Sequence, residues 1–229
     1  MKQLPHTTLI LATTADGKIA DKTSAAARFG SSYDKAHLEK QVSLVDGVIF
    51  GAGTLRAYGT SLPISNPELI KERIKRHQTS QPLHILASAS GKIDVELKFF
   101  QQPIPRWLIT TENCDALWKD RLFFQRVIFG KTKEGSDKFS WQPILANLFD
   151  LGIKKLGILG GGELVASLLS VNAIDEIWLT VCPVIFGGVN APTSVGGIGW
   201  LQSQGIKLHL LEVKQVEQEV FLHYKVIKD

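Results

Sequence analysis

Sulfur is scarce in this chain of 229 residues, which has two cysteines and one methionine. Cys114 and Cys182 lie far apart, form no CxxC pair and have no metal-ligand spacing with the six histidines. That pattern excludes a disulfide framework and a zinc-finger-type site. We therefore predict two buried thiols, no metal centre, and the reducing cytoplasm as the location.

Long apolar runs and dense basic blocks are also missing. The N-terminal stretch MKQLPHTTLILATTADGK contains only the run LILA, which is too short for a secretory signal or a membrane span. Lysine and arginine give a net charge of +4 but are spread along the chain. We expect neither membrane association nor nucleic-acid binding, whereas a small anionic ligand would suit the charge.

Short apolar runs rich in β-branched residues alternate with amphipathic stretches. The runs TTLILAT, GVIFGAG, LHILAS, RWLITT, RVIFG and LGILGG each precede a turn or a helical pattern. This alternation predicts an α/β fold with a largely parallel sheet. The tail alternates apolar and polar residues on both sides of Gln215 to Gln218, which predicts an antiparallel hairpin. Because no repeat or linker divides the chain, we expect one domain over residues 1–229.

Polar caps and glycines mark the ends of the expected helices. Ser32, Asn66 and Ser140 are the predicted N-caps of three helices, and Gly152 is predicted to end the third. Residues 187–200 form the segment richest in glycine, and we expect a long loop there.

The segment LGILGGGELVASLL, residues 156–169, runs from a short strand through three glycines into a helix. Backbone N–H groups of Gly160, Gly161 and Gly162 would approach a phosphate at the helix N-terminus with no Cβ in the way. A sharp turn without a ligand remains an equal alternative for such a cluster. The spacing matches neither a P-loop nor the GxGxxG of a Rossmann fold, so a nucleotide site here belongs to another α/β architecture.

Two other strand ends carry candidate site residues. Gly51, Gly53 and Thr54 follow a strand and would face the same crevice as the three glycines if the two strands are neighbours. The Thr54 hydroxyl has two compatible interpretations, a ligand contact or the N-cap of a short helix. Asp16 and Lys18 follow the first strand, where they either form a turn or orient a substrate and assist proton transfer.

Five motifs, TTADGKIA, VDGVIFGAGT, LGILGGGELVASLL, NAIDEIWLTVCPVIFGG and APTSVGG, occur in an order and spacing that resembles the riboflavin-biosynthesis reductase family. This is the domain that follows the deaminase in bifunctional riboflavin deaminase-reductases, and no deaminase zinc motif occurs here. The resemblance implies a dihydrofolate-reductase-like three-layer fold, with a mixed, mostly parallel sheet flanked by helices. It also implies hydride transfer from NADPH to a small-molecule substrate, usually in a homodimer.

The resemblance assigns the cofactor-binding residues by position. The three glycines 160–162, Glu163 and Leu164 would form the pyrophosphate loop, and Thr54 would contact the cofactor in the GAGT turn. Four strand-end residues would meet the adenosine 2′-phosphate: Ser88, Ser90, Thr110 and Thr111.

The substrate side departs from the family pattern at three positions. Val42 and Ser65 stand where the family usually has arginines, and Leu159 stands where it often has a glutamate. Neutral side chains cannot supply a charge-assisted grip on a phosphate or a pyrimidine edge, so we expect poor turnover of the riboflavin pathway's phosphorylated intermediate. Compensating contacts remain open from Arg28, Lys18 or Arg56.

Three functional hypotheses follow. The first is an NADPH-dependent reductase similar to 5-amino-6-(5-phosphoribosylamino)uracil reductase, or one acting on another pterin-like or carbonyl compound. The second is a nucleotide-binding module without turnover. A hydrolase is disfavoured because the chain has neither G-x-S-x-G nor HExxH.

Overall fold

The computed structural model describes residues 2–112, 114, 118, 123–132 and 139–228. Its elements, in chain order, are β1 (His6–Thr14), α1 (Ser32–Ser43), β2 (Gly47–Gly51), α2 (Ala52–Tyr58), α3 (Pro67–Lys75), β3 (Leu83–Ala87), η1 (Lys98–Gln101), β4 (Arg106–Thr110), β5 (Arg126–Phe129), α4 (Trp141–Asp150), β6 (Lys155–Ile158), α5 (Gly162–Leu169), β7 (Glu176–Cys182), η3 (Gln202–Gln204), β8 (Leu208–Val216) and β9 (Glu219–Val226).

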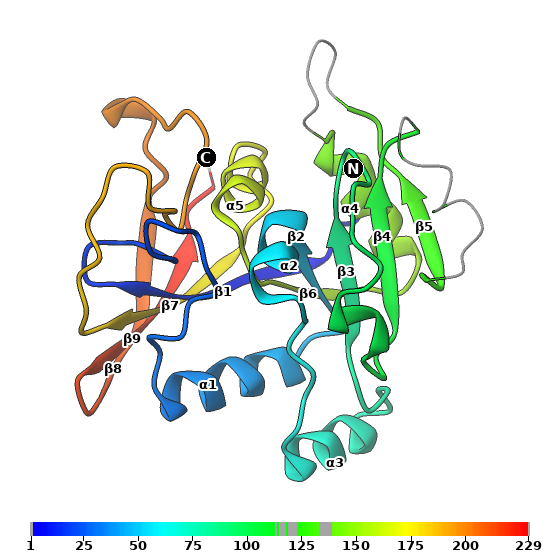
Figure 1. The fold of residues 1–229 in the computed structure, drawn as a ribbon, viewed down its shortest axis with the longest axis horizontal. Helices are drawn as coiled ribbons and strands as arrows, with labels where there is room; N and C mark the ends of the chain where they lie inside the picture. Colours follow the sequence, from blue (N-terminus) through cyan, green and yellow to red (C-terminus); the bar gives the residue numbers. More distant parts are fainter. Residues whose placement is uncertain (1, 113, 115–117, 119–122, 133–138, 229) are drawn as a thin grey trace.

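The strands form one nine-stranded sheet in the order β5-β4-β3-β2-β6-β1-β7-β9-β8 (Figure 1). Pairing is parallel from β5 to β7, whereas β9 runs antiparallel to both β7 and β8. The predicted mostly parallel sheet and the C-terminal hairpin are therefore confirmed. Each of the six apolar runs identified in the sequence overlaps one of the strands β1 to β6.

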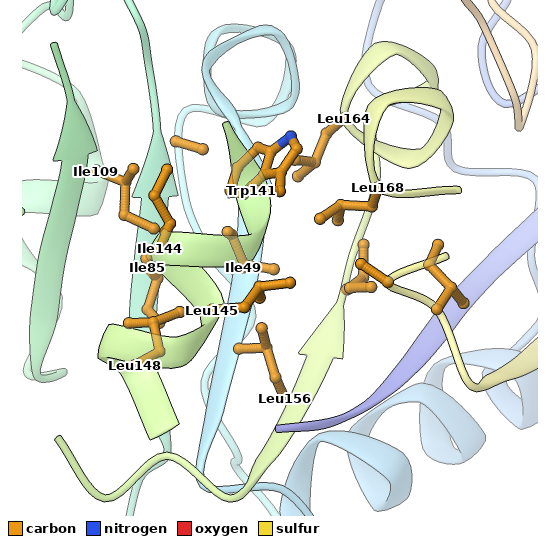
Figure 2. Packing of buried hydrophobic residues seen from close by; sticks show 14 of the residues in the cluster. Ile49, Ile85, Ile109, Trp141, Ile144, Leu145, Leu148, Leu156, Leu164 and Leu168 are labelled. Carbon is orange, nitrogen blue, oxygen red and sulfur yellow. The ribbon is translucent and has the colours of Figure 1, made fainter. Parts of the chain in front are cut away.

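Helices cover both faces of the sheet. Alternate strand residues such as Ile49, Ile85 and Ile158 pack against α4 and α5 in one core cluster, part of which Figure 2 shows. On the opposite face, Val48 packs in a cluster with Val42 of α1, and Phe50 packs in a cluster with Leu55 of α2. Successive residues of each buried strand point to opposite faces of the sheet, so apolar side chains are available to pack against the helices on both faces, as a three-layer fold requires.

The observed helix ends correct one predicted cap. Ser31, not Ser32, caps α1, because its hydroxyl accepts the N–H groups of Tyr33 at 3.1 Å and Asp34 at 3.3 Å. Asn66 caps α3 as predicted, and its side chain accepts the N–H of Glu68.

The helix expected after Ser140 is α4, and it begins and ends where the sequence predicts. Ser140 is the N-cap residue of α4 but makes no side-chain capping bond. Gly152 follows the helix with φ at +97°, a conformation that glycine adopts at low cost.

The segments outside the helical layers also match their predictions. Residues 187–200 contain neither helix nor strand, and Cys114 and Cys182 are both buried and free. In the described part of the chain, no helix combines the length and the apolar character that crossing a bilayer needs.

Candidate functional site

A cavity lies beyond the carboxyl ends of β2 and β6, which are neighbours in the sheet. Its volume is about 490 Å³, within the range of small-ligand sites. The lining residues are Ile19, Ala20, Ser24, Ala25, Gly51, Ala52, Gly53, Thr54, Ala57, Tyr58, Ala87, Phe139, Trp141, Gly161, Gly162, Glu163, Leu164, Ser167 and Pro192. The two glycine-bearing strand ends found in the sequence therefore do face one crevice.

Two hydrogen bonds join these strand ends. The N–H of Gly51 donates to the carbonyl of Gly160 at 3.1 Å, and the N–H of Gly161 donates to the Thr54 hydroxyl at 2.9 Å. Thr54 lies inside α2, whose N-cap is Gly51, so its interpretation as an N-cap is wrong. Instead, its hydroxyl fixes the glycine segment against α2.

The glycines of the cavity wall serve different purposes. A Cβ on Gly53 would meet nothing within 4 Å, so this position leaves open space for a ligand to approach the backbone. Gly160 lies outside the cavity wall. A Cβ on Gly161 would meet only the Thr54 hydroxyl, at 3.3 Å. Gly162 differs, because its Cβ would clash with the carbonyl of Thr193. Gly53 and Gly161 therefore leave the cavity wall open, whereas Gly162 makes room for the neighbouring loop at Thr193.

The residues after the glycines have mixed surroundings. Glu163 lines the cavity, but its Oε1 accepts the N–H of Gly197 at 2.8 Å and so holds the 187–200 loop in place. Leu164 belongs both to the cavity wall and to the core above β2 and β6 (Figure 2). Its position in the cavity wall agrees with the predicted pyrophosphate loop, whereas its packing in the core is unrelated to that prediction.

Aromatic residues that the sequence did not single out complete the wall. Phe139 and Trp141 pack edge to face at 5.2 Å between ring centroids, and the Trp141 Nε1–H donates to the Ser167 hydroxyl. Tyr58, the last residue of α2, also lines the cavity, and its hydroxyl donates to the carbonyl of Ala27 at 3.2 Å. Nothing in the local pattern around these aromatic residues distinguishes a cavity wall from a core.

Asp16 and Lys18 are absent from the cavity wall. The Asp16 carboxylate accepts the Thr14 hydroxyl at 2.6 Å and the N–H groups of Phe186 and Gly187. These bonds, the one from Thr14 foremost, lower the pKa of Asp16 and keep it ionised. Lys18 Nζ donates to the carbonyl of Ala191. Both residues join the first strand's turn to the loop after β7, and their catalytic role stays a prediction.

The four residues predicted to meet the 2′-phosphate lie at the carboxyl ends of the parallel strands, as the cavity does, but they do not line the cavity. Ser88 and Thr110 are buried at the ends of β3 and β4, and Thr111 Oγ1 donates to the carbonyl of Ala89 at 2.9 Å. Ser90 is exposed, and its hydroxyl accepts the N–H of Lys92. Their cofactor role therefore stays a prediction, and only Ala87 of β3 reaches the wall.

The three positions that break the family pattern are apolar or already bonded. Val42 is fully buried against Val48, and Leu159 packs against two core clusters. Ser65 donates both its N–H and its hydroxyl to Glu39, which also accepts the N–H of Asn66. None of these three side chains lines the cavity, so these positions provide no charged contact for an anionic ligand there.

Comparison with known proteins identifies the family. The family model described as the RibD C-terminal domain matches residues 5–222. A 2,5-diamino-6-ribosylamino-4(3H)-pyrimidinone 5′-phosphate reductase from Archaeoglobus fulgidus is 23% identical over 86% of this chain and 89% of its own. The riboflavin biosynthesis protein RibD of Bacillus amyloliquefaciens is 26% identical over 96% of this chain, which spans 57% of that protein.

Solved structures share the fold. A pyrimidine reductase-like protein from Corynebacterium diphtheriae superposes with a TM-score of 0.80 at 23% identity, covering 98% of this chain and 93% of its own. A Thermotoga maritima deaminase/5-amino-6-(5-phosphoribosylamino)uracil reductase gives 0.77 at 18% identity, over 98% and 57%.

Dihydrofolate reductase from Enterococcus faecalis, in complex with NADP(H), gives 0.56 at 11% identity over 97% of each chain. The predicted dihydrofolate-reductase-like fold is thus confirmed. With nearly its whole length matched by one family model, the chain belongs to the RibD C-terminal domain family.

Proposed function

We propose that residues 1–229 act as one reductase domain that transfers a hydride from a reduced nicotinamide nucleotide to a ribosylaminopyrimidine-type substrate. The observation that carries the proposal is the cavity at the ends of β2 and β6, whose wall is bare backbone at Gly53 and Gly161. Similar proteins are named as 2,5-diamino-6-ribosylamino-4(3H)-pyrimidinone 5′-phosphate reductases or as riboflavin biosynthesis proteins. The nicotinamide supplies the hydride, and the protein binds and orients the reactants.

The residues present fit a dinucleotide. Gly161 caps the N-terminus of α5 without a side chain, which leaves backbone N–H groups and the positive end of the helix dipole for a pyrophosphate. Trp141 and Phe139 offer flat apolar surface for a ring. Thr54 keeps the glycine segment in register by its bond to Gly161.

NADPH is the proposed form of the cofactor. Ser88 and Ser90 follow the carboxyl end of β3. Two exposed lysines, Lys92 and Lys131, follow the carboxyl ends of β3 and β5. A 2′-phosphate at this edge would gain charge-assisted contacts that NADH lacks. Fluorescence titration should therefore give a lower dissociation constant for NADPH than for NADH, and equal constants would contradict the assignment.

The assay that tests the reductase follows loss of NADPH absorbance with ribosylaminopyrimidine compounds. We expect the phosphorylated compound to give a kcat/KM below about 10⁴ M⁻¹s⁻¹, the lower end of the ordinary enzyme range, because Val42, Ser65 and Leu159 carry no charge. Tight NADPH binding without oxidation by any compound of the panel would instead support a nucleotide-binding module.

A homodimer is proposed from the free edge of the sheet. β8 is the terminal strand, and Leu208, Leu210 and Val213 on it are between 42% and 56% exposed. An exposed, apolar edge strand of nine residues invites pairing, and a second copy offers the same edge. Light scattering should give a dimer mass that Val213→Lys converts to a monomer mass, and a monomeric wild type would refute the pairing.

The cytoplasm is proposed as the location. Two free, buried thiols fit a reducing compartment, and the relatives are biosynthetic enzymes, one of which is chloroplastic. Fractionation of cells that express the chain from its native gene, with immunodetection, tests this.

A further inference from the structure

The turn after β1 is closed around the Asp16 carboxylate. The Thr14 hydroxyl donates to Asp16 Oδ1 at 2.6 Å, and its oxygen accepts the N–H of Lys18 at 2.9 Å. The Thr14 N–H in turn donates to the Lys18 carbonyl at 2.9 Å. Because Thr14 is only 1% exposed, these bonds fix the turn to the buried end of β1.

Asp16 also holds the loop that follows β7. Its Oδ1 accepts the N–H of Phe186 at 3.2 Å, and its Oδ2 accepts the N–H of Gly187 at 2.7 Å. Gly187 has a φ of +63°, a conformation that glycine adopts at low cost. One carboxylate therefore joins the turn after β1 to a loop that lies far away in the sequence.

The two segments joined by Asp16 continue directly into the cavity wall. The N–H of Ile19 donates to the carbonyl of Pro192 at 2.9 Å, and both residues line the cavity. Between Asp16 and this contact, Lys18 and Thr193 form an antiparallel bridge. Figure 1 shows the segment after β1 beside the loop after β7. A change at Asp16 would therefore alter how these two parts of the wall lie against each other.

A second connection to the cavity runs through Phe186. Its ring packs edge to face on the Phe29 ring, with 5.4 Å between the centroids. Phe29 belongs to the segment that supplies Ser24 and Ala25 to the cavity wall. Ser24 has a φ of +58°, which is uncommon for serine, so surrounding contacts must hold this segment in its conformation.

One side of the cavity, which we call the β1 wall, consists of Ile19, Ala20, Ser24, Ala25 and Pro192. We propose that Asp16 is a positioning residue that fixes the β1 wall where the substrate contacts it. The proposal rests on the reductase function above, whose nucleotide contacts use the glycines and the aromatic residues and leave the β1 wall for the substrate. Because hydride transfer needs closely aligned reactants, a displaced wall weakens productive binding.

The surroundings of Asp16 favour positioning over proton transfer. Asp16 is absent from the cavity wall, and both of its carboxylate oxygens accept hydrogen bonds from the protein. These bonds, the one from Thr14 foremost, lower the pKa of Asp16, so the carboxylate has no proton to donate at neutral pH. A general acid or base needs hydrogen-bond reach of the substrate. Asp16 therefore acts on the reaction through the β1 wall.

The test combines local order with kinetics in Asp16→Ala, which removes all three acceptor contacts. Hydrogen exchange, followed by mass spectrometry over residues 17–29 and 184–197, should be about tenfold faster in the variant. With the ribosylaminopyrimidine compound that the wild type reduces best, KM should rise about tenfold while kcat falls less than about threefold. The dissociation constant of NADPH should stay within about twofold, because the glycine wall is untouched.

Three further variants keep the result interpretable. Asp94→Asn is the matched control, because Asp94 is also exposed, accepts the N–H of Glu96 at 2.9 Å and lies outside the cavity wall. Asp16→Asn keeps one acceptor oxygen and should give intermediate values. Phe29→Leu removes the second connection and also serves if Asp16→Ala does not fold. It should raise KM less than Asp16→Ala, and the two effects should not add, because both act on one wall.

The outcomes separate the possible roles of Asp16. Loss of one limb from the pH profile of kcat/KM in Asp16→Asn, with KM unchanged, would show proton transfer and overturn the proposal. Unchanged hydrogen exchange would also overturn it, as would faster exchange with an unchanged KM, which a merely structural carboxylate would give. Faster exchange in Asp16→Ala, together with a wild type that oxidises NADPH with no compound, would refute the reductase function alone.

Discussion

The cavity wall and the α1 end of the molecule, which lies outside that wall, are built by different means. At the β6 end, backbone groups form the wall, and Gly161 and Gly53 leave space by having no side chain. At the α1 end, buried carboxylates fix the backbone, with Glu39 holding the segment before α3 and Glu219 holding the start of α1. Bare backbone presents no side-chain identity, whereas hydrogen bonds to a carboxylate depend on the side chains of this chain. The glycine-bearing strand ends resemble the family's motifs, whereas Val42 and Ser65 depart from them.

The largest expected effect tests whether the α1 end can regain the family's charge. Val42→Arg places a guanidinium at a fully buried position among the apolar side chains of Val45, Val48 and Ile64. Leaving a buried charge without a partner should cost about 3–5 kcal/mol, measured by urea denaturation. Val42→Met, which adds length without charge, should cost less. A stable Val42→Arg protein with improved turnover of the phosphorylated substrate would break the contrast.

The next effect tests the glycine wall. Gly161→Asp should weaken NADPH binding by at least about a hundredfold, or 2.7 kcal/mol, because its carboxylate would meet the pyrophosphate at the start of α5. The fold should survive, since φ is −56° there and aspartate is a favoured N-cap. Gly161→Asn has nearly the same shape without the charge and should bind better than Gly161→Asp. Unchanged affinity in both would reduce the glycine segment to a sharp turn.

A smaller effect concerns the tie between α2 and the glycine segment. Thr54→Val removes the acceptor at 2.9 Å from the Gly161 N–H and should weaken NADPH binding about tenfold, or 1.4 kcal/mol. Thr54→Ser keeps the hydroxyl and should restore most of the affinity. If serine and valine behave alike in titration, the hydroxyl does not position the loop.

The smallest effect belongs to Glu39 and depends on pH. Burial raises its pKa, but the hydrogen bonds from Asn66 and Ser65 outweigh this and hold the pKa below 4.5. Its contribution to stability is therefore present above pH 4.5 and is lost as the pH falls through the lower folded value. Glu39→Gln should lower the free energy of unfolding by about 1 kcal/mol at neutral pH. It should also reduce the loss of stability below pH 4.5, measured by denaturation at a series of pH values. An unaltered limb would show that another group titrates there.

Sequence patterns predicted the sheet well and the cavity in part. Each of the first six strands is an apolar run flanked by turn residues, and the hairpin alternates with period two, so local signals suffice. Gly51, Gly53, Thr54 and Gly161 were found because glycine at a strand end is itself a signal.

The remaining cavity residues carry no local signal. Trp141 and Tyr58 look like ordinary helical residues, and their place in the wall depends on packing between elements far apart in the chain. Trp141 and Ser167, which are hydrogen-bonded to each other, lie 26 residues apart on α4 and α5. Such pairs become visible only when the strand order is known.

The position of β6 has a consequence for how the chain acquires its shape during synthesis. β6 separates β1 from β2 in the sheet, although more than ninety residues lie between β2 and β6 in the chain. The ribosome therefore releases β1 and β2 long before the strand that joins them exists, and their inner edges stay open meanwhile. Such non-local pairing slows folding and exposes edges to aggregation. Nascent chains that end before Lys155 should thus need holdase chaperones, and ligand should rescue only chains that extend past α5.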